Sequence, residues 1–185
     1  MIQHTSSSNH HEIRDAIRAL CAGFPDEYFR KVDEARAYPA EFVDALTRAG
    51  WMAALIPHEY GGSGLRPTEA SVIMEEINRC GGNSGACHGQ MYNMGTLLRH
   101  GSQAQKEKYL PKIASGEWRL QSIGVTEPTT GTDTTKIKTS AVKKDGRYVI
   151  NGQKVWISRI QHSDWMILLA RTTPLAEVKK KSEGM

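Results

Sequence analysis

Cysteine is scarce in this chain of 185 residues, and no hydrophobic run is long. Cys21, Cys80 and Cys87 are odd in number and lack the spacing of a disulfide framework, which favours a reducing, cytoplasmic compartment. The longest apolar run, residues 165–170, falls far short of the roughly 20 residues that span a bilayer. Residues 1–11 hold neither an apolar signal core nor an Arg-rich transit pattern, so we expect a frayed N-terminus.

The excess of positive charge is also small. The net charge is +4 and the pI is about 9.0, which suits a phosphate-bearing ligand but is too weak to predict nucleic-acid binding. Apolar residues make up 39% of the chain and charged residues 24%, so a globular core is expected. The length allows one domain or one and a half.

The first two thirds of the chain have helical spacing of apolar residues, with start and stop signals at the ends. Residues 25–38 are an exception and show no clear period. Ser102 and Gln105 form a capping box, Pro111 is expected to bend or end the helix that follows, and Gly116 to terminate the segment. Helices are predicted over residues 11–22, 39–50, 67–81, 83–101 and from 102 onwards.

After Trp118 the pattern changes to strands and turns. Asp145-Gly146 between two apolar stretches predicts a hairpin, and residues 164–170 predict a buried strand. The expected fold is α+β, with an all-α domain over residues 1–116 and an incomplete antiparallel β-domain over residues 117–185. A sheet this small would leave edges and one apolar face uncovered, so we expect a part of a longer protein.

Two stretches of the predicted β-domain combine strand ends with hydroxyl groups. One is Val125-Thr126-Glu127-Pro128, which continues to Asp133 through a Thr-rich loop, and the other is Val155-Trp156-Ile157-Ser158. We predict that each follows or ends a strand. Hydroxyls, a Gly turn and one large aromatic suit a flat, phosphate-bearing cofactor, although an ordinary sheet with Thr-rich turns has the same composition. Glu127, followed by Pro128, is expected to hold the turn rather than act as a base.

Other familiar patterns are incomplete. Gly61-Gly62-Ser63-Gly64 lacks the spacing of a dinucleotide-binding loop, and Ala86 stands where a nucleophile elbow needs Gly. Cys80, Cys87 and His88 do not complete a set of metal ligands, so no metal is expected. The lysines of residues 179–181 are interpreted as a solvated loop.

The two hydroxyl-bearing stretches closely resemble the acyl-CoA dehydrogenase family. The resemblance covers nearly all of residues 12–175, with several motifs in the right order. The matching motifs are Val125-Thr126-Glu127-Pro128, Gly131-Thr132-Asp133, Ile137-Lys138-Thr139, residues 148–154, Trp156-Ile157-Ser158, residues 56–64 and Lys108-Tyr109-Leu110-Pro111.

The resemblance implies a helical domain and the first part of a β-domain, with a C-terminal helical bundle lying outside this chain. It implies an FAD enzyme that introduces a trans-2 double bond into an acyl-CoA thioester, passes electrons to an electron-transfer flavoprotein and forms a homotetramer. The catalytic Glu base of the family also lies outside this chain, so no catalytic residue is assigned here.

The resemblance implies roles for particular residues. The backbone of Val125 and Thr126 and the Thr126 hydroxyl match positions at the flavin pyrimidine edge, and Ser158 matches a hydroxyl near N5 and O4. Trp156 matches the aromatic that covers one flavin face. Thr132 matches a hydroxyl at the FAD pyrophosphate and the CoA entrance. The cofactor-binding set also includes Ile123 and Ile157, and the acyl cavity is assigned Met91 and Tyr92, for which core packing is the alternative.

The sequence departs from the family in three places. Thr129-Thr130 replace a small Gly-Ala pair, Thr132 replaces the commoner Ser but keeps its hydroxyl, and Arg159 stands where Asn is frequent. Three alternatives stay open at this point: a flavin oxidase or monooxygenase on the same fold, a DNA-binding flavoprotein relative, and a module for protein interaction.

Overall fold

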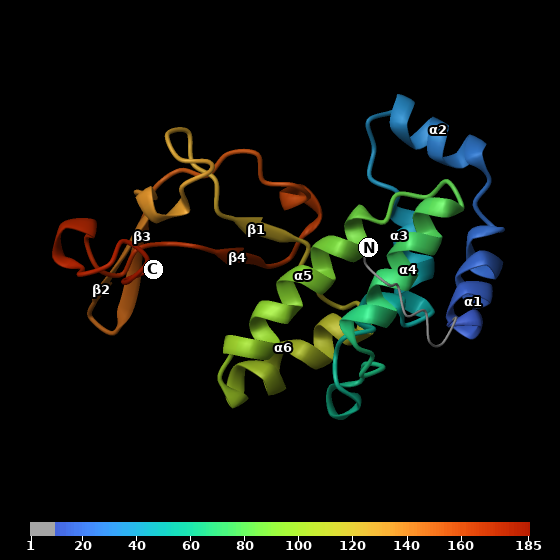
Figure 1. Ribbon diagram of the computed structural model, residues 1–185, viewed down its shortest axis with the longest axis horizontal. Helices are drawn as coiled ribbons and strands as arrows, with labels where there is room; N and C mark the ends of the chain where they lie inside the picture. The colour runs from blue at the N-terminus through green and yellow to red at the C-terminus, as the bar shows by residue number, and fades with distance from the viewer. Residues whose placement is uncertain (1–9) are drawn as a thin grey trace, which may run out of the picture. The chain divides into compact units, whose positions relative to one another are not determined.

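The computed structural model describes residues 10–185, and these separate into two compact units that divide between Arg119 and Leu120 (Figure 1). The predicted frayed N-terminus, residues 1–11, falls almost entirely outside the described residues. The first unit holds six α-helices and two short 3-10 helices: α1 His11–Cys21, α2 Asp26–Glu34, α3 Ala40–Arg48, η1 Trp51–Ala53, η2 His58–Tyr60, α4 Pro67–Arg79, α5 Gly85–His100 and α6 Gln103–Ser115.

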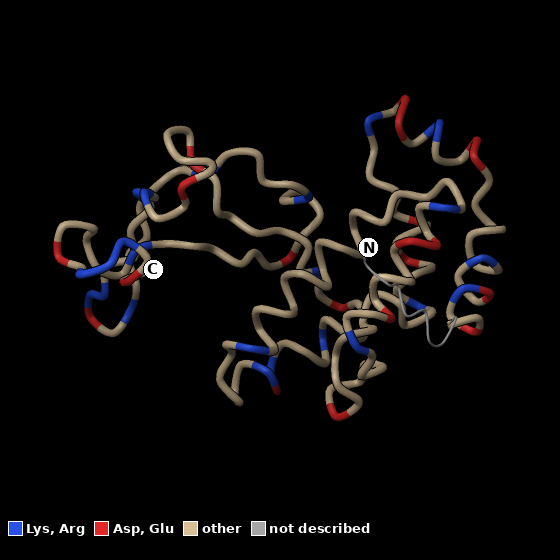
Figure 2. Tube along the Cα trace, in the orientation of Figure 1, with Lys and Arg blue, Asp and Glu red and all other residues tan. Residues whose placement is uncertain are grey.

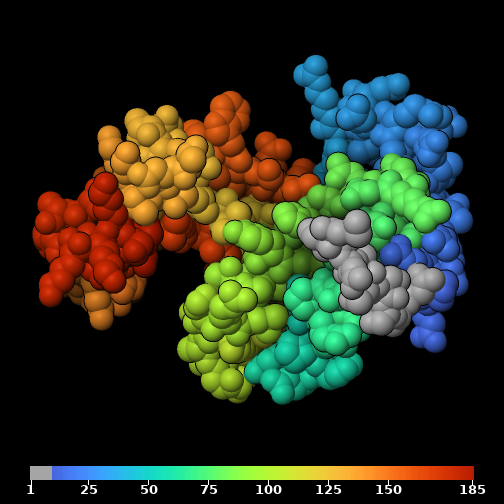
Figure 3. Space-filling model, viewed as in Figure 1, coloured from blue at the N-terminus to red at the C-terminus, as the bar shows by residue number. Residues whose placement is uncertain are grey.

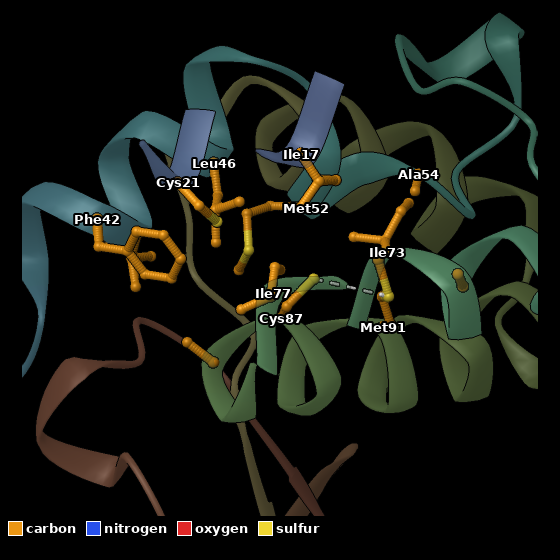
Figure 4. Close-up of a cluster of buried hydrophobic side chains, with 13 residues drawn as sticks. Ile17, Cys21, Phe42, Leu46, Met52, Ala54, Ile73, Ile77, Cys87 and Met91 are labelled. Atoms are coloured by element: carbon orange, nitrogen blue, oxygen red, sulfur yellow. Dashed lines mark hydrogen bonds between the residues drawn. The ribbon is translucent and has the colours of Figure 1, made fainter. Parts of the chain in front are cut away.

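The helical unit closes around side chains that the helical spacing predicts. Phe42 and Leu46 of α3 and Ile73 and Ile77 of α4 are at most 1% exposed, and Ile17 of α1 lies in the same cluster. Figure 4 shows these side chains between the helices, with Cys87 and Met91 of α5 completing the cluster. Burial of such apolar area is the main source of stability for this unit.

One buried carboxylate ties α1 to α4. Glu76 is fully buried, and its oxygens accept hydrogen bonds from Arg14 Nη1 at 2.8 Å and Arg18 Nε at 2.6 Å. The hydrogen bond from Arg18, helped by that from Arg14, outweighs burial and lowers the pKa of Glu76. Glu75, its neighbour on α4, also pairs with Arg14 but has a side chain that is 61% exposed.

The predicted helix ends are mostly confirmed. Ser102 Oγ accepts from the Gln105 N–H at 3.2 Å, while the Gln105 side chain accepts from the Ser102 N–H at 2.8 Å. Gly116, at φ 80°, ends α6 as expected. Pro111 was expected to bend or end this helix. It does not end it, because α6 continues to Ser115.

Residues 25–38, for which no element was predicted, contain helix α2. It holds no buried residue and rests on aromatic contacts: Phe29 packs edge-on against both Tyr28 and Phe42, with ring centres 5.1–5.2 Å apart. A helix with only a partly buried face shows a weak apolar period, which is why the sequence does not reveal it.

The second unit contains four strands: β1 Ser122–Gly124, β2 Ser140–Lys144, β3 Arg147–Asn151 and β4 Met166–Leu168. β2 and β3 form the predicted antiparallel hairpin, and its turn residues Asp145 and Gly146 both have positive φ, as a tight hairpin requires. β1 and β4 form a separate parallel pair, with Ser122 opposite Met166. The antiparallel expectation therefore holds for the hairpin alone.

Residues 152–165 contain no strand, so the predicted strand ending at Trp156 is wrong. β3 stops at Asn151, and only the short helix η4 Ile160–His162 interrupts the irregular chain before β4. The predicted strand at residues 164–170 is confirmed in part, because β4 occupies its centre but is only half-buried. Short 3-10 helices also occur at Thr134–Lys136 and Leu175–Glu177.

The charge of the chain is divided unevenly between the units. Residues 120–185 hold eleven Lys and Arg but six Asp and Glu, so the whole positive excess lies in this unit. In Figure 2 the basic residues of the hairpin β2–β3 and of the C-terminal segment appear in blue. Among residues 10–185 no helix is long and apolar enough to cross a membrane, and the three cysteines are free.

Replacing Glu76 with Ala should destabilise the helical unit by about 2 kcal/mol, because it removes charge-assisted hydrogen bonds from Arg14 and Arg18, which keep Glu75 and Asp15 as partners. Urea unfolding of the 185-residue chain, followed by circular dichroism, measures the change. Glu75→Ala is the matched control and should shift stability by less than about 0.5 kcal/mol. If the two substitutions lowered the unfolding free energy equally, the buried ion pairs of Glu76 would contribute no more than the exposed pair of Glu75.

Candidate functional site

A buried carboxylate lies at the centre of the second unit. Glu127 is 5% exposed, and its oxygens accept from the N–H groups of Lys138 at 2.6 Å and Thr139 at 2.9 Å and from Lys154 Nζ at 3.0 Å. Burial raises the pKa of Glu127, but hydrogen bonds from Thr139, the Lys138 backbone and Lys154 outweigh it and bring the pKa to about 2. The expectation that Glu127 holds the turn is confirmed by this geometry.

Lys154 joins the two hydroxyl-bearing stretches. Its side chain is 8% exposed, and Nζ donates to the Val125 carbonyl at 2.9 Å as well as to Glu127. One residue further on, the Val155 N–H donates to the Thr126 carbonyl at 3.0 Å. Segments 125–127 and 154–155, far apart in sequence, therefore lie side by side.

Trp156 follows directly and has an unusual conformation. Its φ is 61°, a left-handed backbone that costs a bulky residue about 1–3 kcal/mol, and its side chain is largely in solvent, with the residue 89% exposed. Figure 3 shows the orange segment around residues 150–165 at the surface of this unit. Because strained backbone conformations cluster at functional sites, this exposed Trp marks a candidate ligand-binding surface.

Serine side chains anchor the backbone beyond Trp156. Ser122 Oγ of β1 donates to the Ser158 carbonyl at 2.8 Å, and Ser163 Oγ donates to the Arg159 carbonyl at 3.0 Å. The Ser158 residue is exposed, and its own hydroxyl bonds to no other group among residues 10–185. The segment is thus fixed through its carbonyls while the Ser158 hydroxyl stays available.

The loop with Thr132 is held at its two ends. Glu127 and Thr130 exchange backbone hydrogen bonds of 2.9 and 3.1 Å, and Asp133 accepts from the Thr135 N–H at 3.2 Å. Thr132 is exposed between them, and a side chain at Gly131 would meet nothing within 4 Å. The loop offers a hydroxyl and open space without intruding side chains.

These groups fit the flavin that the family resemblance implies. Across residues 10–185, the Val125 and Thr126 N–H groups and the Thr126 hydroxyl donate to no protein acceptor. Ile123 lies in β1 and Ile157 beside Trp156, both half-buried. Free donors, an exposed indole and an exposed hydroxyl are the features needed to hold a flat, polar ring system.

Met91 and Tyr92 occupy different environments on α5. Met91 is 4% exposed inside the helical core, where Cys87 Sγ lies 3.8 Å from its sulfur, as the core-packing alternative describes. Tyr92 is 58% exposed and stacks on His88 with ring centres 6.0 Å apart. Of the two, Tyr92 is the side chain available to a ligand.

Sequence reasoning did not assign roles to Lys154, Ser122 and Ser163. Lys154 falls within a matching motif, but no spacing rule pairs it with Glu127 and Val125, which lie 27 and 29 positions earlier in the sequence. Within the described residues, no cluster of three or more His, Cys, Asp or Glu side chains is suited to a metal.

Replacing Glu127 with Gln should lower the unfolding free energy of the second unit by up to about 3 kcal/mol at pH 7. The folded-state pKa lies below the ordinary value of 4.5, so the carboxylate stabilises the fold above that value and loses this effect as pH falls toward 2. The difference from wild type should therefore shrink between pH 5 and pH 2 in urea unfolding. Glu177→Gln, at an exposed site, is the control, and a difference independent of pH would contradict the assignment.

Comparison with known proteins places both units in one family. The model of the acyl-CoA dehydrogenase N-terminal domain matches residues 7–117, and that of the middle domain matches residues 122–185. Isovaleryl-CoA dehydrogenase of Pongo abelii is 40% identical over 164 residues, which cover 84% of this chain and 38% of the relative. The chain thus spans well under half the length of that relative.

Solved structures agree with this result. An acyl-CoA dehydrogenase from Geobacillus kaustophilus has a TM-score of 0.85 and 27% identity, covering 98% of this chain and 47% of that one. A glutaryl-coenzyme A dehydrogenase in complex with glutaryl-CoA has a TM-score of 0.83 and 29% identity, covering 95% and 45%. With two domain models matched in order over almost its whole length, the chain belongs to the acyl-CoA dehydrogenase family.

Proposed function

We propose that this chain is the N-terminal and middle-domain part of an FAD-dependent enzyme that introduces a trans-2 double bond into an acyl-CoA thioester. The observation that carries the proposal is the anchored arrangement of Val125-Thr126 beside Val155-Trp156, with free donors on one stretch and an exposed indole on the other. When bound, FAD would accept the β-hydride at N5, and a Glu base outside this chain would take the α-proton.

The residues of this chain would then bind and orient FAD, and they would not transfer protons. The Val125 and Thr126 N–H groups and the Thr126 hydroxyl would meet the pyrimidine edge of the flavin, where negative charge gathers on reduction. Trp156 would cover one face and exclude water. The Ser158 hydroxyl would bond near N5 and O4, and Thr132 would meet the pyrophosphate.

The basic character of the second unit supports phosphate-rich ligands. Its excess of five positive charges attracts both FAD and the CoA moiety of a substrate. We further propose an electron-transfer flavoprotein as electron acceptor and a homotetramer as the assembly, as in the family. Tyr92 would contribute to the acyl cavity.

The test is to purify the complete translation product and add acyl-CoA without oxygen. The protein should be yellow, and the flavin absorbance should bleach with a substrate; isovaleryl-CoA is tried first because a 40% identical relative is named for it. A colourless protein that FAD does not reconstitute would refute the proposal. Rapid reoxidation by oxygen would indicate an oxidase, and a salt-dependent shift of DNA in a gel would indicate a DNA-binding relative.

The 185-residue chain alone should bind FAD poorly and show no turnover, because the base and the adenine side of the family's site lie outside it. Fluorescence titration with FAD and anaerobic mixing with acyl-CoA measure both properties. Dehydrogenation by this chain alone would contradict the assignment of the base.

Trp156→Ala in the complete product should weaken FAD binding about fivefold or more, since stacking on an aromatic contributes about 1–3 kcal/mol. Affinity is measured by titrating the apoprotein with FAD. Tyr148→Ala is the matched control, because Tyr148 is an aromatic of the same unit, 58% exposed on the hairpin. If both variants bind FAD like the wild type, the role of Trp156 is wrong.

A further inference from the structure

The carbonyl that Lys154 contacts and the N–H of Thr126 belong to one peptide group. Lys154 Nζ lies 2.9 Å from the Val125 carbonyl oxygen, and the same peptide unit ends in the Thr126 N–H. That N–H has no acceptor among residues 10–185, although its surroundings are well ordered by hydrogen bonds. A charged donor thus acts on one end of a peptide dipole whose other end is free.

A hydrogen bond from an ammonium group polarises the peptide that accepts it. Electron density moves toward the carbonyl oxygen, and the N–H of the same unit becomes a stronger donor, since chained hydrogen bonds strengthen one another by roughly 10–30%. The Lys154 side chain is only 8% exposed, so water screens its charge little. Hydrogen bonds from charged groups are about twice as strong as neutral ones.

Glu127 keeps the ammonium in this position. Lys154 Nζ is bound to Glu127 Oε1 at 3.0 Å, while the two carboxylate oxygens also accept from the Lys138 and Thr139 backbone. Because two peptide N–H groups share the negative charge of Glu127, the ammonium is not its only partner. The carboxylate therefore fixes Lys154 without fully neutralising its effect on the Val125 carbonyl.

We propose that Lys154 is a positioning residue that polarises the Val125–Thr126 peptide, so that the Thr126 N–H stabilises negative charge on the pyrimidine edge of reduced flavin. The proposal rests on the proposed function, because it requires FAD at the Thr126 N–H. Lys154 would therefore help to set the reduction potential of bound FAD without touching the flavin itself.

The experiment compares Lys154→Met and Lys154→Arg with wild type in the complete translation product reconstituted with FAD. Lys154→Met keeps the length of the side chain and removes its charge, whereas Lys154→Arg keeps the charge. Lys144→Met is the control, since Lys144 is exposed on the hairpin and its loss changes the net charge equally. The midpoint potential of bound FAD and its affinity are measured for each.

Lys154→Met should weaken the binding of reduced FAD, relative to oxidised FAD, about two- to fourfold. For a two-electron couple this lowers the midpoint potential by about 10–20 mV. Lys154→Arg should restore most of the shift, and Lys144→Met should show none. A merely structural role would change affinity for both redox states alike and leave the potential where it was.

An unchanged potential in Lys154→Met, or an equal shift in Lys144→Met, overturns the proposal. If Lys154→Met fails to retain FAD, retention by Lys154→Arg supports the proposal and loss from both overturns it. If the wild-type product binds no FAD, the proposed function is refuted. Failure of the proposed function can thus be distinguished from failure of the role of Lys154.

A second measurement needs no flavin. In the 185-residue chain, amide hydrogen exchange at Val155, whose N–H donates to Thr126, should be at least tenfold faster in Lys154→Met than in wild type. Lys144→Met should match wild type. Equal protection in all three chains would show that Lys154 does not position this segment.

Discussion

The second unit depends on one buried ammonium group bonded at once to a carboxylate and a peptide carbonyl. Between β1 and β4 most of the chain is irregular apart from one hairpin, so few ladder hydrogen bonds hold it. Lys154 and Glu127 take the place of a ladder and connect residues 125, 127, 138, 139 and 154. Buried polar groups stabilise only when every partner is satisfied, and here both charges are.

The helical unit uses a buried carboxylate in a different way. Glu76 joins two regular helices that an apolar core already holds together, so its pairing with Arg14 and Arg18 adds to the packing of α1 against α4. Glu127 instead organises backbone that has no regular structure. The same chemical group therefore supports packing in one unit and defines a candidate ligand site in the other.

The sequence predicts well those features that local physics determines. The spacing of Ile73 and Ile77, the capping box at Ser102 and the Asp145-Gly146 turn are each set by neighbouring residues, and the structure confirms all three. The family resemblance predicts roles for Trp156 and Thr126, but it does not predict the hydrogen bonds that fix their segments. Their support comes from contacts between residues about 30 positions apart, such as Lys154 with Val125, which no periodicity reveals. The strand predicted at Trp156 fails for the same reason, because distant hydrogen bonds override its β propensity.

The parallel pairing of β1 with β4 has a consequence for the order of folding. Ser122 and Met166 are 44 positions apart, and the whole candidate flavin site lies in the loop that their pairing closes. Closing so long a loop costs entropy before its contacts form, whereas the β2–β3 hairpin inside it closes over a few residues. The hairpin is therefore expected to form in microseconds and the ladder later. The contacts of Lys154 with Val125 and Glu127 span 29 and 27 positions, so they are expected to form after the hairpin and no later than the ladder.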